Sequence, residues 1–101
     1  MLVSDYVFGL LCSAVRGLAT NTGSLQSRLQ STFEGTLARL REDDFADADQ
    51  KKLFGEIMES ITAIDGSPEL GRVRATLNEM SDDAASGLAG KFFDLFKSTL
   101  R

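Results

Sequence analysis

The side chains best suited to chemistry lie in one acidic run, residues 42–49, with the sequence EDDFADAD. Clustered carboxylates can hold a divalent cation, act as an acid and base pair, or contact a basic partner. No register of the run supplies the ligands, the glycine and the final glutamate that an EF-hand loop requires. The simplest interpretation of the run is a solvated loop with a helix cap. A divalent-cation sensor is a functional hypothesis of lower rank than the two that close this subsection.

The residue types that most catalytic and metal sites require are missing from the sequence. The chain has no His, no Trp and one cysteine, Cys12. It therefore lacks an imidazole base, a Ser-His or Cys-His pair, an internal disulfide and a cysteine-based zinc site. The glycines are scattered singly, so they form no phosphate-binding loop. We expect a protein that is not an enzyme and uses no catalytic residue, cofactor or metal.

The net charge of −4 conceals an uneven distribution along the chain. Residues 42–69 contain nine acidic and two basic residues, a net charge of −7, whereas both flanking segments are weakly basic. A protein that binds nucleic acid usually carries the opposite, a basic stripe that contacts phosphates. The charge pattern therefore disfavours nucleic acid and leaves a basic protein surface as a suitable partner.

The elements that must position these residues are helices. Apolar residues recur at helical spacing, and no stretch shows the sustained alternation that indicates a strand. A length of 101 residues suits one domain. The sequence therefore predicts a single all-α domain, an antiparallel bundle of four to five helices. The expected helices span about 4–19, 25–41, 48–64, 68–80 and 82–100, and residues suited to capping their N-termini are Ser4 or Asp5 for the first, then Ser24, Asp47, Ser67 and Ser81.

The first predicted helix is apolar over most of its circumference, which favours a position at the centre of the bundle. Its apolar residues are Val3, Tyr6, Val7, Phe8, Leu10, Leu11, Ala14, Val15 and Leu18. The remaining narrow edge carries Gly9, Ser13 and Gly17, four residues apart. Such spacing allows close packing against another helix, within the chain or across a dimer. The alternative is an exposed edge on which small residues are merely tolerated.

Two stretches need to be weighed as membrane segments. The apolar stretch YVFGLLCSAV has no Lys or Arg before it, unlike a signal peptide, and it is shorter than the roughly 20 residues of a membrane span. The C-terminal stretch KFFDLFKSTLR combines aromatic residues and cations, but its helical spacing favours a core face, with Phe93 at the edge. We expect a cytoplasmic protein that does not bind membranes.

These patterns favour a protein-interaction module that self-associates, as a homodimer, through the first helix and exposed aromatic residues. Phe45, inside the acidic run, and Phe93 are the expected aromatic anchors. Phe45 could instead fold back as a hydrophobic staple or loop plug. The residues expected to bind a partner are Glu42, Asp43, Asp44, Phe45, Asp47, Asp49 and Phe93. The alternative function is a small acidic inhibitor, of the immunity type, that masks a basic partner surface with residues 42–69.

Overall fold

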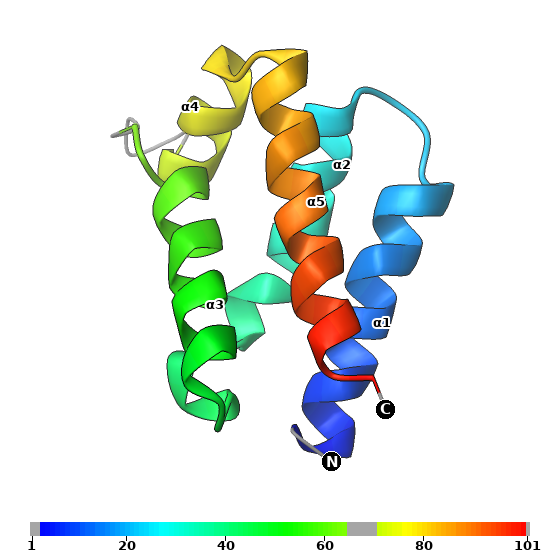
Figure 1. Cartoon of the computed structure of the whole chain (residues 1–101). Coiled ribbons are helices and arrows are strands. Elements are labelled where there is room, and N and C mark those ends of the chain that lie inside the picture. Colours follow the sequence, from blue (N-terminus) through cyan, green and yellow to red (C-terminus); the bar gives the residue numbers. More distant parts are fainter. Residues whose placement is uncertain (1–2, 65–70, 101) are drawn as a thin grey trace.

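The computed structural model describes residues 3–64 and 71–100, and within these ranges it contains helices and loops but no strand (Figure 1). The predicted all-α bundle is confirmed. The helices are α1 (Asp5–Thr20), α2 (Leu25–Gly35), η1 (Leu37–Arg39), η2 (Glu42–Asp44), α3 (Ala48–Ile61), α4 (Gly71–Glu79) and α5 (Asp82–Ser98). In this part of the chain, no helix is long and apolar enough to cross a bilayer.

Four of the predicted capping residues begin helices as expected. Each accepts a hydrogen bond from the backbone N–H three residues later, which satisfies a donor that the first turn leaves unpaired. The pairs are Ser4 with Val7 at 3.2 Å, Ser24 with Ser27 at 3.1 Å, Asp47 with Gln50 at 3.3 Å and Ser81 with Ala84 at 3.1 Å. The fifth predicted cap, Ser67, lies outside the described residues.

α2 and α5 each pack against three other α-helices, whereas α1 packs against two. α5 packs against α1, α2 and α3, running antiparallel to α1 and α3, while α4 closes one end against α2 and α3 (Figure 1). α1 lies at one side, mainly against α2 and α5. The prediction that the first helix is central is therefore wrong. A wide apolar arc shows what a helix could bury, but the number of neighbours that reach it depends on how the other helices pack.

The predicted end of the second helix at residue 41 is also wrong, because α2 begins at Leu25 as expected but ends at Gly35. Thr36 leaves helical geometry, with φ −131° and ψ −59°. Glycine lowers helix propensity by about 1 kcal/mol relative to alanine, and the β-branched threonine that follows does not restore it. The break turns the chain back toward the core, where Leu37 and Leu40 are buried. α3 and α5 end at Ile61 and Ser98, a few residues before their predicted ends.

Candidate functional site

The acidic run divides into carboxylates that hold the backbone and carboxylates that face solvent. Asp44 accepts a hydrogen bond from the Arg41 N–H at 2.8 Å, and Asp47 caps α3. Glu42, Asp43 and Asp49 are exposed. Among the described residues, no three His, Cys, Asp or Glu side chains come close enough to hold a metal ion. The geometry therefore lends no support to the divalent-cation hypothesis, and the acids that could contact a partner are the exposed ones, namely Glu42, Asp43, Asp49 and, besides its capping role, Asp47.

Phe45 is buried in the core, so the prediction that it is an exposed anchor is wrong. Its exposed fraction is 0%, and its ring lies 5.2 Å from the Phe54 ring, centroid to centroid. This position matches the alternative of a loop plug. Burying a phenylalanine side chain contributes about 1.5–3 kcal/mol, which favours drawing the run against α3 over leaving the ring in water.

The capping role of Asp47 leads to a testable prediction. Asp47→Ala is expected to lower the free energy of unfolding by about 1 kcal/mol, because the Gln50 N–H at the start of α3 loses its acceptor. Urea denaturation followed by circular dichroism measures this change. Asp43→Ala is the matched control, since Asp43 is exposed and its loss should change the stability by less than about 0.5 kcal/mol. Equal effects of the two substitutions would contradict the assigned role.

The small-residue edge of α1 is not a close-packed seam within the chain. Gly9 and Ser13 are exposed, and a Cβ added at Gly9 would meet nothing within 4 Å. A Cβ at Gly17 would lie 3.6 Å from the Thr32 hydroxyl of α2, an ordinary van der Waals contact. Only the last of the three positions thus faces a neighbouring helix. A role for this edge in contact with a second copy stays a prediction.

An aromatic surface crosses the boundary between α1 and α5. Phe8 of α1 stacks on Phe96 of α5, with ring centroids 5.8 Å apart. Phe93 precedes Phe96 by three residues, so the two lie on the same side of α5, and Leu100 follows just beyond the end of that helix. Phe93 is 51% exposed and Leu100 is 47% exposed. We call these four residues the aromatic face.

The aromatic face agrees only in part with the pattern in the sequence. The exposure of Phe93 at the edge of its helix agrees with the prediction. Leu100 has the spacing of a core residue, and its exposure follows from its position beyond the end of α5. Tyr6, at 62% exposure, is the most exposed large apolar residue described. It lies two residues before Phe8, and residues two apart do not share a helix face, so Tyr6 is not part of the aromatic face.

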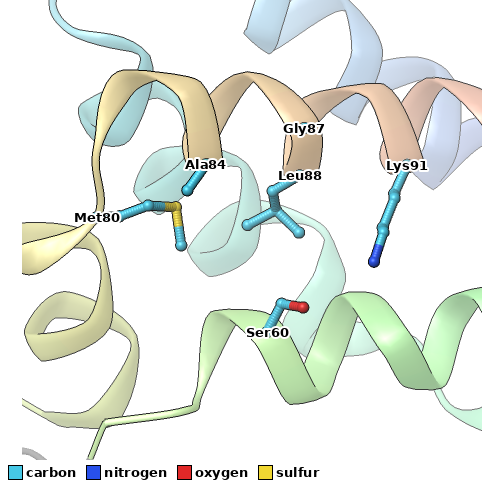
Figure 2. A pocket seen from close by; sticks show the side chains of 6 residues that line it. All are labelled: Ser60, Met80, Ala84, Gly87, Leu88 and Lys91. Carbon is cyan, nitrogen blue, oxygen red and sulfur yellow. The ribbon is translucent and has the colours of Figure 1, made fainter.

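A second surface feature is a groove between α3 and α5. It is a hollow of about 390 Å³, with Ser60 on one wall and Leu88 and Lys91 reaching from the other (Figure 2). We call it the α3–α5 groove; its lining residues are Ser60, Met80, Ala84, Gly87, Leu88 and Lys91. An adjoining hollow of about 360 Å³ shares Ser60 and Lys91 and adds Glu56, Glu59 and Ala63. No sequence signal marks this groove, because its residues come from separate segments that only the bundle brings together.

The residues of these two surfaces are suited to contacting a partner and not to catalysing a reaction. Neither surface contains a nucleophile paired with a base. The Lys91 ammonium lies 3.7 Å from the Glu56 carboxylate, in a pair that is about two-fifths exposed and of small energetic value. Compared with family models, curated proteins and solved structures, the chain shows no significant match.

Proposed function

We propose that this chain is a cytoplasmic, non-enzymatic protein-interaction module that self-associates through the aromatic face. One observation carries the proposal. Phe93 exposes about half of its surface one helical turn from Phe96, whose ring stacks on Phe8, and the similarly exposed Leu100 follows just beyond the end of α5. Scattered single apolar residues are ordinary on a protein surface, whereas neighbouring ones form a patch that suits a partner.

The composition of the face suits a second copy of the same chain. Large aromatic side chains carry much of the binding energy at protein interfaces because they bury a large area and lose little conformational freedom. Asp5 lies one turn before Phe8, and Lys97 lies one turn after Phe93, so both signs of charge flank the patch. A two-fold interface joins the same surface of both copies, and mixed charges allow opposite signs to meet there.

Replacing Phe93 with glutamate tests the proposal. We expect the native chain to sediment as a dimer at micromolar concentration and Phe93→Glu to sediment as a monomer. The dimer dissociation constant should rise at least about thirtyfold, which corresponds to about 2 kcal/mol for the loss of a central aromatic contact. The free energy of unfolding of the monomer should change little, since Phe93 is already half exposed.

Tyr6→Glu is the matched control, because it introduces the same charge at a similarly exposed aromatic residue outside the face. This variant should remain a dimer. A native chain that sediments only as a monomer, or a dimer that Phe93→Glu leaves intact, would contradict the proposal. Equal disruption by both variants would place the interface elsewhere on α1.

The acidic alternative rests on different residues. Glu42, Asp43 and Asp49 are exposed and make no capping hydrogen bond, so they are free to contact a basic surface. Burial of Phe45 removes the aromatic anchor from this segment. Masking of a basic partner is therefore a second proposal, now supported by charge alone.

A further inference from the structure

The α3–α5 groove is lined in part by small side chains. The adjoining hollow shares Ser60 and Lys91 with it. The stretch of α5 from Ala84 to Lys91 rises about 10 Å, or two helical turns. Ser60, Ala84 and Gly87 project little into the groove, and small side chains at a contact let helix axes approach to about 8–10 Å.

Gly87 is not explained by the packing of the chain itself. It lies in the interior of α5, where glycine weakens a helix relative to alanine. A Cβ added at Gly87 would meet nothing within 4 Å, so no neighbouring residue requires a glycine at this position. Gly90 is equally open but does not line the groove. A helix that approaches the groove would, however, come closest where a side chain is missing.

The charges at the groove indicate what kind of helix would fit. Met80 and Leu88 make an apolar floor, and Lys91 already has a carboxylate partner in Glu56. Lys52, one turn before Glu56 on α3, adds an exposed cation near the adjoining hollow, but the other neighbouring charges are acidic. Glu59 is exposed on α3, and on α5 two exposed aspartates stand one turn outside the groove, Asp83 before Gly87 and Asp94 after Lys91. An apolar floor with an acidic rim complements an amphipathic helix that carries Lys or Arg beside its apolar face.

We propose that the α3–α5 groove binds a basic amphipathic helix of a partner protein. The apolar face of that helix lies against Met80, Ala84, Gly87 and Leu88, and its cations pair with Glu59, Asp83 and Asp94. This site lies on other residues than the aromatic face, so it leaves that face available for self-association.

The test uses a synthetic helix of leucine and lysine, with the leucines along one face, and a charge-reversed control peptide in which glutamate replaces lysine. Fluorescence anisotropy of the labelled peptides measures binding to the full chain. We expect the lysine peptide to bind and the glutamate peptide not to bind. The affinity should fall as salt rises from about 0.05 M to 0.5 M, because salt screens the acidic rim. Amide NMR shifts should map to Ser60, Ala84 and Gly87.

Gly87→Met is the decisive variant, and Gly55→Met in α3 is its matched control, because Gly55 is exposed and equally open but lines neither hollow. Both substitutions improve helix propensity in open space, so both variants should fold. Gly87→Met should weaken binding of the lysine peptide at least about tenfold, since the side chain occupies the groove, whereas Gly55→Met should change it less than about twofold. Failure of the lysine peptide to bind, equal binding by both variants, or shifts centred on Phe93 would overturn the proposal.

Measuring peptide binding in the Phe93→Glu variant distinguishes failure of the groove proposal from failure of the proposed self-association. In Phe93→Glu, the lysine peptide should bind with unchanged affinity, because that substitution lies outside the groove. Loss of self-association with retained peptide binding would show that the two surfaces act independently. Loss of peptide binding in Phe93→Glu would overturn the groove as the site while leaving the proposal of self-association standing.

Discussion

Phe45→Ala is expected to lower the free energy of unfolding by about 3–5 kcal/mol, the range for truncating a fully buried aromatic side chain. The substitution removes the ring that packs on Phe54 and leaves a cavity beneath the acidic run. A domain of this size is stable by about 5–15 kcal/mol in total, so the loss would be a large fraction of the stability of the chain. Urea denaturation followed by circular dichroism measures the change.

The matched control for Phe45 is Tyr6→Ala, the truncation of an aromatic residue that is mostly exposed. It should cost about 1 kcal/mol or less, because little buried surface is lost. If Phe45→Ala were no more destabilising than this control, Phe45 would not be a core residue. The sequence-based expectation of an exposed anchor would then be restored.

Gln50→Ala is expected to have the next largest effect, a loss of about 2–4 kcal/mol. Gln50 is buried, and its Nε2 donates to the backbone oxygen of Ser98 at 3.2 Å and to the Ser98 Oγ at 3.1 Å. These bonds join the beginning of α3 to the end of α5. Alanine removes both of them and leaves a cavity.

Gln50→Leu separates the two causes of that loss. Leucine has a similar volume, so it fills the space, and it removes the Gln50 Oε1, which has no hydrogen-bond partner among the described residues. We expect it to cost about 1 kcal/mol or less, because burying an unpaired polar atom is itself unfavourable. Thermal or urea denaturation of the two variants gives the comparison. A leucine variant as unstable as the alanine variant would show that the bonds to Ser98 outweigh packing.

Local signals in the sequence were sufficient to place most helices. Ser4, Ser24, Asp47 and Ser81 begin helices as predicted because a cap needs only a side-chain oxygen and a backbone N–H three residues later. The end of α2 at Gly35 was not predicted, although Gly35 and Thr36 are both poor helix formers. Neither residue alone stops a helix, and the break also depends on burial of Leu37 and Leu40 against other elements.

The candidate surfaces were predictable to different degrees. Phe93 could be placed at the edge of its helix from spacing, since angles around one helix follow from the sequence. The fate of Phe45 could not be predicted in the same way, because an aromatic residue among carboxylates suits either an exposed anchor or a plug. The α3–α5 groove gave no signal at all, since Ser60 and Gly87 become neighbours only when the two helices pack.

The amino-acid sequence by itself determined the all-α class, the capping residues and the absence of histidine chemistry. These properties depend on residue type and on contacts within one or two helical turns. Tertiary structure alone decided that α1 is not the central helix, that Phe45 is buried and that Phe96, on the same side of α5 as Phe93, stacks on Phe8. These outcomes depend on which apolar helix faces pack against one another, and those contacts join segments that are far apart in the chain.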